Sequence, residues 1–208
     1  MAEYKLYYFN VRGRAEAVRY IFALAEQHYE DVRIPKEDWP KYKETMPFGQ
    51  MPVLEVTEGA HSFKLAQSAA ISRYLGNKFG FVGKTVEENA ILDSYADLMN
   101  DMLMGFITAH HETDPEKKKE LFTKYFTEGI IEFLKYFEKA LSENKDGVIV
   151  GDKVTWVDLL FCTVWDFIPK ETKEVLFARF PSCKALYHKI MSLPKIAEWI
   201  EKRPVTDM

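Results

Sequence analysis

The pattern of the chain changes once, near residue 78, and this change constrains the fold more than any other feature. Before it, strand-like and helix-like segments alternate, whereas almost every later segment has the apolar periodicity of a helix. Alternating strands and helices are typical of an α/β domain, while helices alone build a separate bundle. We therefore expect a small α/β domain over 1–78, a linker over 79–85 and an all-helical domain over 86–208.

The first part contains strand and helix candidates in alternating order. Four segments have strand-like composition: Lys5–Phe9, Glu30–Ile34, Val53–Val56 and Ser62–Leu65. The last two form a hairpin that turns near Gly59. Two segments have helical spacing: Arg14–Ala25 and Ser68–Leu75. We expect the second helix to end near Gly76, because glycine often terminates helices. The order of elements predicts a mixed sheet.

In the second part, helix boundaries are marked by capping residues. A long segment with an apolar stripe covers Glu87–His110. Asp114 and Pro115 match the N-cap and the first helical position, so a second helix begins there and its apolar residues continue to Leu141.

A polar loop over Asn144–Lys153 precedes another helix start. There Thr155 and Asp158 stand at the positions of a capping box, with apolar residues flanking it. Prolines then divide the chain up to Lys202 into shorter helices: Pro169, Pro181 and Pro194.

The composition excludes several classes of function. The chain has 208 residues, 47% of them hydrophobic, and a net charge of -4, which disfavours nucleic acid as a partner. No apolar run approaches the roughly 18 residues that span a bilayer, and the first residues lack a secretory pattern. Cys162 and Cys183 form neither a disulfide framework nor a metal motif. We expect a cytoplasmic protein that binds neither membranes nor nucleic acid.

Four short polar segments stand at strand ends or helix starts, where a small thiol peptide can be bound. They are Leu6–Arg14, Trp39 with Lys43, Gly49–Pro52, and Gln67 with Ser68. A helix that begins after Gln67 offers backbone donors and its dipole to a carboxylate, although Ser68 could simply cap that helix. Trp39 and Lys43 share one helix face, but such a pair is also common on protein surfaces. No single segment identifies a site.

Together these segments resemble the glutathione S-transferase family, most closely its sigma class, which includes the haematopoietic-type prostaglandin D synthases, and among these the nematode enzymes. The resemblance covers essentially the whole chain and rests on seven segments: Tyr8–Asn10, Arg12–Glu16, Asp38–Pro40, Pro47–Gly49, Met51–Leu54, Gln67–Ser68 and Val154–Asp158. It implies an α/β thioredoxin-like N-terminal domain, an all-α C-terminal domain and a homodimer.

The resemblance implies catalytic roles for Tyr8 and Arg14. A free thiol is only a few per cent ionised at neutral pH, and a hydroxyl that donates to the sulfur favours the thiolate. In the family the tyrosine before Phe-Asn has this role, which selects Tyr8, and Arg14 supplies a nearby cation. By strand alternation alone Tyr7 is a competitor on the opposite face, and a strand tyrosine is most often a core residue.

The resemblance also implies a set of glutathione-binding residues. Gln67 and Ser68 would hold the γ-glutamyl carboxylate, and the cysteinyl part would pair with Met51 beside a cis bond to Pro52. The full set is Tyr8, Trp39, Lys43, Gly49, Gln50, Met51, Pro52, Gln67, Ser68 and, from the neighbouring subunit, Asp101.

The implied activity is transfer of the glutathione thiolate to small hydrophobic electrophiles in detoxification, with peroxidase or isomerase side activity. Glutathione is the co-substrate, and we expect no metal requirement, since Asn100 interrupts the acidic stripe of the long helix. Vertebrate prostaglandin D synthases carry a tryptophan where this chain has Thr108, which predicts inefficient prostaglandin isomerisation. The expected electrophile pocket comprises Phe9, Gly13, Arg14, Leu103 and Met104.

Two other interpretations stay open. One is a carrier of haem or other apolar ligands in the dimer cleft, which the aromatic and methionine content permits. The other is an interaction scaffold that keeps the fold without the chemistry. The presence of Tyr8, Met51–Pro52 and Gln67–Ser68 together argues against a scaffold.

Overall fold

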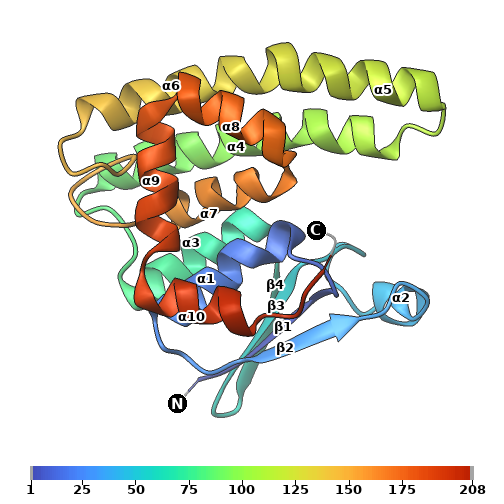
Figure 1. Cartoon of the computed structure of the whole chain (residues 1–208). Helices are drawn as coiled ribbons and strands as arrows, with labels where there is room; N and C mark the ends of the chain where they lie inside the picture. The colour runs from blue at the N-terminus through green and yellow to red at the C-terminus, as the bar shows by residue number, and fades with distance from the viewer. Residues whose placement is uncertain (1, 207–208) are drawn as a thin grey trace. The chain divides into compact units, whose positions relative to one another are not determined.

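The computed structural model describes residues 2–206. Their contacts divide the chain into two units. One contains the residues up to Val82 and those from Met191 onward, and the other is Gly83–Ile190. The two units correspond to an α/β part and a helical part (Figure 1).

Within the described residues of the first unit, four strands form one mixed sheet in the order β2-β1-β3-β4. The strands are β1 Glu3–Phe9, β2 Glu30–Ile34, β3 Val53–Glu58 and β4 His61–Ala66. β1 pairs with β2 in parallel and with β3 antiparallel, and β3 and β4 form an antiparallel hairpin. The expected mixed sheet and hairpin are confirmed.

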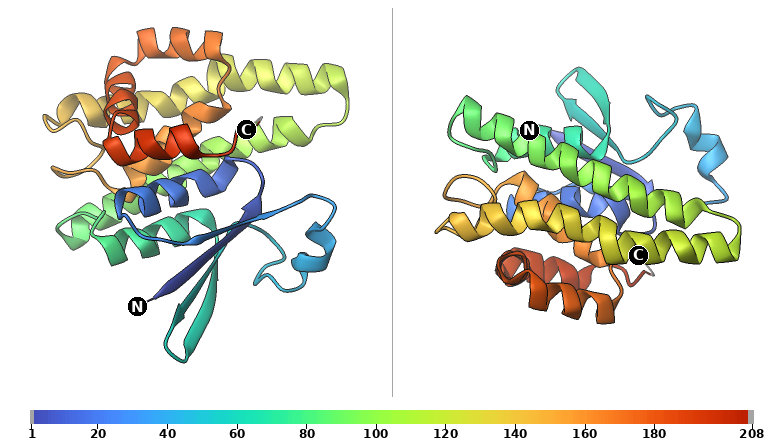
Figure 2. Two further views of the ribbon diagram at one scale, coloured as in Figure 1. Left: turned by 60° about the horizontal axis from the view of Figure 1, so that its bottom comes forward. Right: turned by 90° about the horizontal axis from the view of Figure 1, so that it is seen from above.

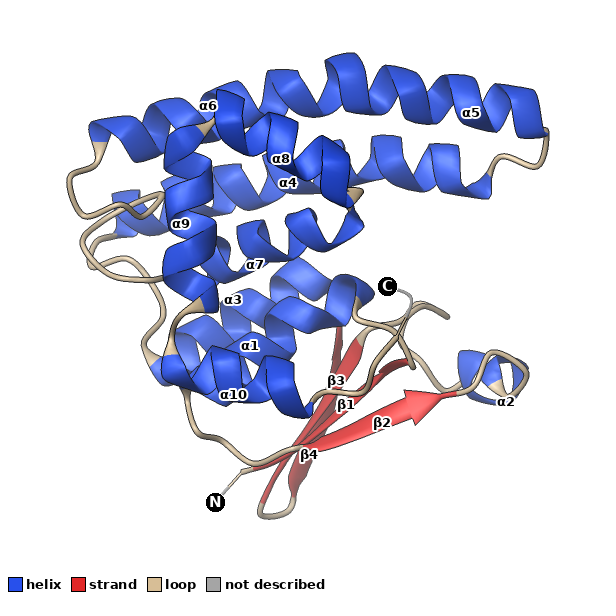
Figure 3. Ribbon diagram, viewed as in Figure 1, coloured by secondary structure: helices blue, strands red, loops and turns tan. Residues whose placement is uncertain are grey.

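Helices cover one face of this sheet, as Figure 3 shows. They are α1 Glu16–Leu24, preceded by a 3-10 turn over Gly13–Ala15, α3 Ser68–Phe79 and α10 Pro194–Lys202. α1 packs against both α3 and α10. A short helix, α2 Trp39–Lys43, lies beyond the end of β2. Leu6, Ile21, Leu54 and Ile71 are fully buried between the sheet and these helices.

Two features of the first unit differ from the expectations. α3 continues past Gly76 to Phe79 and ends at Gly80, whose φ of +83° is the left-handed conformation that glycine adopts readily. The helix therefore extends into the expected linker of 79–85. α10 packs against α1, so it groups with the α/β unit, whereas the expected limits assigned it to the helical domain of 86–208.

In the second unit, α4 Val86–His111 lies beside a long antiparallel helix (Figure 2). This second helix consists of α5 Pro115–Lys124, a π-helical turn over Tyr125–Gly129, and α6 Ile130–Glu143. α7 Trp156–Val164 packs against α4, and the Phe137 and Phe161 rings of α6 and α7 stack at 4.7 Å. The remaining elements of this part are a 3-10 turn over Trp165–Phe167, α8 Lys170–Arg179 and α9 Pro181–Met191.

The expected helix caps are present. The Asp114 carboxylate accepts from the backbone N–H of Lys117 at 2.9 Å. At the start of α7, Thr155 and Asp158 form the predicted capping box, and the second Asp158 oxygen accepts from Ile149 N–H at 2.8 Å. The predicted fold class, an α/β domain followed by an all-helical one, is confirmed. Of the helices in residues 2–206, none is long and apolar enough to cross a membrane.

Candidate active site

Three of the predicted segments emerge at one end of the sheet. Tyr7 of β1 lies opposite Val53, the first residue of β3. Val53 in turn lies opposite Ala66, the last residue of β4. The residues after β1 and β4 and those before β3 therefore gather at the same end. The segments that meet there are Tyr8–Phe9, Met51–Pro52 and Gln67–Ser68.

Tyr8 and Tyr7 have different hydrogen-bond partners. The backbone N–H of Arg14 donates to the Tyr8 hydroxyl oxygen at 3.2 Å. The Tyr7 hydroxyl instead donates to a Glu55 carboxylate oxygen at 3.3 Å. Because the Tyr8 oxygen accepts this bond, its own hydrogen can point toward another acceptor. Tyr8 thus has the arrangement of a hydrogen-bond donor at the sheet end.

Gly13 is the residue that lets the loop after β1 approach Tyr8. Its φ is +44°, in the left-handed region that favours glycine. A Cβ atom on Gly13 would lie 2.7 Å from the Tyr8 hydroxyl oxygen and 2.8 Å from its Cε1 atom. Any side chain there would displace the tyrosine ring or the loop. Gly13, predicted for the electrophile pocket, also shapes the surroundings of the Tyr8 hydroxyl.

The surroundings of Tyr8 keep its hydroxyl protonated. Burial raises the pKa of Tyr8 above its ordinary value, and the Arg14 N–H, the Arg14 cation and Arg19 oppose that rise only in part. The hydroxyl is therefore a neutral donor throughout the physiological pH range. Arg14 lowers the pKa of Tyr8 through its backbone N–H as well as through the side-chain charge that the sequence predicted.

Trp39 and Lys43 lie on α2 near the same end of the sheet. The Trp39 ring packs edge-on against Phe9 with centroids 5.7 Å apart, and it also contacts the buried cluster of Ile34, Met46, Val53 and Ala66. Lys43 is exposed, and a Cβ on Gly49 would lie 3.6 Å from its side chain. These contacts bring α2 close to Phe9 and to the loop before β3.

The loop before β3 carries Gln50, Met51 and Pro52. The Met51–Pro52 bond is cis, as the resemblance implies. Met51 packs against the buried cluster under Trp39, Pro52 is buried, and Gln50 is exposed. A neutral amide donor therefore stands at the surface in the residue after Gly49, whose Cβ position lies 3.6 Å from the Lys43 side chain.

The N-terminus of α3 is open for an anion. Gln67 is its N-cap residue, and no side chain makes a capping hydrogen bond there. The first N–H groups of this twelve-residue helix are thus directed outward with the positive end of the dipole. Gln67 itself has φ +73° and ψ 117°, a conformation that costs about 1–3 kcal/mol in non-glycine residues and is concentrated at functional sites. A carboxylate is the group that such a terminus stabilises best.

The remaining predicted residues lie on α4, in the helical unit. Asp101 is exposed, Met104 is 47% exposed and Leu103 is half-buried. Met102, the neighbour of Leu103, is buried in the core. Thr108 is exposed and its hydroxyl donates to the Met104 carbonyl at 2.9 Å. Across residues 2–206, no group of three His, Cys, Asp or Glu side chains is arranged to hold a metal ion.

The sequence did not predict the buried charged pair that follows the loop after β1. Glu16 and Arg19 of α1 are both 0% exposed, and Arg19 donates to Glu16 at 3.0 Å. Burial alone would raise the pKa of Glu16, but Arg19, the Trp199 N–H and Arg203 outweigh it and hold the pKa below its ordinary value. The only local signal was an acid and an arginine three residues apart, a spacing that also occurs on solvated helix faces.

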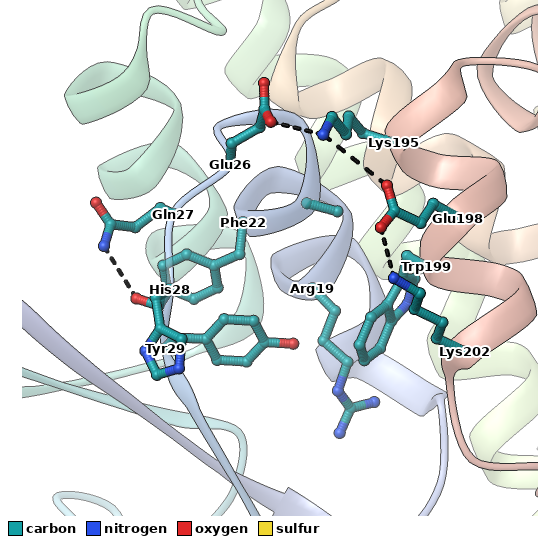
Figure 4. Close-up of a pocket in the computed structure, with 11 residues that line it drawn as sticks. Arg19, Phe22, Glu26, Gln27, His28, Tyr29, Lys195, Glu198, Trp199 and Lys202 are labelled. Atoms are coloured by element: carbon teal, nitrogen blue, oxygen red, sulfur yellow. Dashed lines mark hydrogen bonds and ion pairs between the residues drawn. The ribbon is translucent and has the colours of Figure 1, made fainter.

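A cavity of about 340 Å³ opens between α1 and α10 (Figure 4). None of the predicted site residues lines it. Its walls include the stacked rings of Phe22 and Tyr29 and the side chains of Arg19, Trp199 and Lys195. The cavity is therefore separate from the end of the sheet where Tyr8 lies.

Comparison with known proteins decides the family. Residues 4–77 match the family model of the glutathione S-transferase N-terminal domain, and residues 100–203 match that of the C-terminal domain. The chain belongs to the glutathione S-transferase family. The family and fold class that the sequence segments predicted are thereby confirmed.

Relatives of this glutathione S-transferase match it over its length. A probable glutathione S-transferase 5 of Caenorhabditis elegans is 44% identical, and a hematopoietic prostaglandin D synthase of Gallus gallus is 40% identical, each over 99% of both chains. A solved structure described as a monomeric glutathione S-transferase of the hookworm Necator americanus is 41% identical, with a TM-score of 0.84 over 99% of this chain and 100% of that one.

Proposed function

We propose that this glutathione S-transferase conjugates the glutathione thiolate to small hydrophobic electrophiles, with Tyr8 as the hydrogen-bond donor to sulfur. The observation that supports this role is the Arg14 N–H bond to the Tyr8 oxygen, which leaves the tyrosine hydrogen available for a thiolate. Arg14 strengthens that donor through its amide and its charge. Glutathione is the co-substrate of the family.

The energy required of Tyr8 is within reach of a hydrogen bond to an anion. The pKa of a free thiol is about 8.5, so lowering it by about two units requires roughly 3 kcal/mol of preferential thiolate stabilisation. Hydrogen bonds to charged groups contribute about 1.5–3 kcal/mol. Tyr8 with the Arg14 cation therefore accounts for most of the shift.

We assign the two carboxylates of glutathione to two separate binding sites. The open N-terminus of α3, with Gln67 and Ser68, suits the γ-glutamyl carboxylate. Trp39, Lys43 and Gln50 supply an indole N–H, an ammonium and an amide for the glycyl carboxylate. The cysteinyl part would then lie along Gly49, Met51 and Pro52, between the two sites and beside Tyr8.

The electrophile would lie next to the sulfur. We propose that Phe9, Gly13, Arg14, Leu103 and Met104 contact it, as the sequence predicts. Met104 is 47% exposed, so its flexible thioether side chain is accessible to an apolar substrate. Thr108 bonds its own helix and offers no aromatic surface, so we expect slow prostaglandin isomerisation.

We further propose a cytoplasmic homodimer of the sigma class. Both cysteines are buried free thiols, which suits a reducing compartment. Asp101, exposed on α4, would reach the glutamyl ammonium of the neighbouring subunit's glutathione. The hookworm relative is described as monomeric, so the assembly is to be measured by sedimentation velocity. An Asp101→Asn variant should raise KM for glutathione only if the protein is a dimer.

Conjugation of glutathione to chlorodinitrobenzene tests the proposal, with wild type and Tyr8→Phe assayed from about pH 5.5 to about pH 8, below the pKa of a free thiol. We expect a rate controlled by an ionisation well below that pKa, and a large loss of kcat in the variant with glutathione still bound. Equal turnover by the two proteins would refute the role of Tyr8. Glutathione binding without conjugation, together with sub-micromolar haem binding, would instead indicate a carrier of apolar ligands.

A further inference from the structure

Arg19 of α1 connects the buried charges of the α/β unit to the loop that touches Tyr8. Its guanidinium donates to the backbone carbonyls of Val11 at 2.9 Å and Arg12 at 3.3 Å. The same side chain donates to Glu16 at 3.0 Å and to Asp31 at 3.2 Å. Arg19 is fully buried, and its bond to Glu16 is made away from water, whereas its bonds to Val11, Arg12 and Asp31 are partly buried.

The loop held by Arg19 is the one that carries the partners of Tyr8. Gly13 and Arg14 directly follow the two carbonyls that Arg19 binds. A second arginine, Arg33 of β2, donates to the Asn10 side chain at 3.1 Å and to Asp31 at 2.8 Å. Two arginines that share Asp31 therefore hold the start of the loop, and the loop in turn places the Arg14 N–H at the Tyr8 oxygen.

The network is completed by the end of α10, far away in the sequence. One Glu16 oxygen accepts from Arg19, and the other accepts from Arg203 at 2.7 Å and from the Trp199 indole at 2.8 Å. Arg203 also donates to the Tyr20 hydroxyl at 3.2 Å. Figure 4 shows Arg19 from α1 and Trp199 from α10 at the same cavity.

Arg203 affects Arg19 because both arginines bind the Glu16 carboxylate. Glu16 is buried, and its carboxylate needs partners on both oxygens. When Arg203 supplies one of them, Arg19 can divide its donors among Glu16, Asp31 and the loop carbonyls. Without Arg203, the Glu16 carboxylate would attract Arg19 more strongly. The hydrogen bonds from Arg19 to the Val11 and Arg12 carbonyls would then weaken.

We propose that Arg19 and Arg203 are positioning residues for Tyr8, and that the C-terminal segment after α10 thereby controls how well the enzyme stabilises the glutathione thiolate. The inference rests on the proposed function of Tyr8. Neither arginine touches the tyrosine, and both act through the loop that carries Gly13 and Arg14.

The test compares Arg203→Gln with Lys202→Gln. Both changes remove one positive charge from adjacent residues, but Lys202 is exposed and pairs with Glu198 outside the network. In Arg203→Gln we expect kcat/KM at about pH 6.5 to fall roughly 3- to 10-fold, the effect of a weakened hydrogen bond. The kinetic pKa of the bound thiol should rise by about 0.5–1 unit, while KM for glutathione changes less than about 2-fold. Lys202→Gln should match wild type.

Two further variants separate positioning from a general loss of stability. Arg203→Lys keeps a charged donor toward Glu16 and should restore the wild-type pH profile. Arg19→Lys retains the charge, but a single ammonium cannot donate to Asp31, Glu16 and the two carbonyls together as the guanidinium does, so its profile should shift further than that of Arg203→Gln. If Arg19→Lys does not fold, the comparison of Arg203→Gln with Arg203→Lys still tests whether the network positions Tyr8. An Arg203→Gln enzyme with lower thermal stability but a wild-type pH profile would overturn the inference.

The Tyr8→Phe variant, measured in parallel, distinguishes a failure of the positioning role from a failure of the proposed function. If Tyr8→Phe loses activity and Arg203→Gln keeps the wild-type profile, only the positioning role is wrong. If Tyr8→Phe is fully active, the proposed function fails and the inference fails with it. Absorbance of the bound thiolate in the ultraviolet gives a second readout, which does not depend on the electrophile.

Discussion

The backbone nitrogen of Arg14 lies 3.2 Å from the hydroxyl oxygen of Tyr8 and donates a hydrogen bond to it. This bond does not depend on the arginine side chain. Arg14 therefore supports Tyr8 in two separable ways, through an amide that any residue provides and through a cation that only a basic residue provides. Substitutions at position 14 can measure the second contribution alone.

We predict that Arg14→Ala is less damaging than Tyr8→Phe. The alanine variant keeps the amide donor and loses the charge, so the kinetic pKa of the thiol should rise by about one unit and the rate at about pH 6.5 should fall about 10-fold. Arg14→Lys should lie close to wild type. The measurement is the pH dependence of kcat/KM for glutathione. A loss as large as that of Tyr8→Phe would mean that the side chain carries the whole effect.

We predict that Gly13→Ala impairs catalysis beyond its effect on stability. The new Cβ would lie 2.7 Å from the Tyr8 hydroxyl oxygen, so the ring or the loop must move. Misplacement of a catalytic group by about 1 Å can cost about 100-fold in rate, and we expect a fall in kcat of at least about 10-fold.

Gly59→Ala is the matched control for Gly13→Ala. Gly59 has a similar φ of +61°, but nothing lies within 4 Å of its Cβ position. Gly59→Ala should lose about 1–2 kcal/mol of unfolding free energy from the left-handed backbone, and Gly13→Ala should lose more because the ring or the loop must also move; urea denaturation measures both. Only Gly13→Ala should lose activity. Equal kinetics in the two variants would show that the contact with Tyr8 is unimportant.

The elements that the sequence predicted well are those with local signals. β2 begins and ends at the expected residues, Glu30 and Ile34, and the capping box of Thr155 and Asp158 forms as its spacing indicates. Gly76 misled the prediction because a glycine inside a helix costs only about 1 kcal/mol, which tertiary packing can override. Gly76 is buried in α3, and the helix ends one turn later.

Arg14 was predicted as the partner of Tyr8, but the charged network behind the loop could not be predicted, because Asp31 and Arg203 are distant in sequence from Glu16 and Arg19. Arg19 falls on the helical segment expected at Arg14–Ala25, where a charged residue ordinarily belongs to the solvated face. It is buried because Asp31 on β2 and the Val11 and Arg12 carbonyls satisfy it. The contact between Arg203 and Glu16 depends on the packing of α10 against α1, which no local pattern encodes.

Glu16 makes the stability of the protein depend on pH in the acid range. Its pKa in the folded protein lies below the ordinary value of 4.5, because Arg19, Trp199 and Arg203 together outweigh the cost of burial. A carboxyl whose pKa is lowered by folding stabilises the protein above its unfolded pKa. That contribution is therefore complete above about pH 4.5 and is lost as the pH falls from there toward the folded value.

We predict that Glu16→Gln removes this acid sensitivity together with much of the stability. Breaking a buried ion pair costs about 3–5 kcal/mol at neutral pH, because the charged partners stay buried. The gap in unfolding free energy between wild type and the variant should narrow as the pH is lowered from about 4.5 toward about 3, since protonation then removes the same charge from the wild type. Urea denaturation at a series of pH values measures the gap.

Glu198→Gln, which removes an exposed carboxylate on α10, should leave stability nearly unchanged because solvent screens its ion pair with Lys202. A gap for Glu16→Gln that stays constant over the whole range would mean that Glu16 is not held ionised by Arg19 and Arg203.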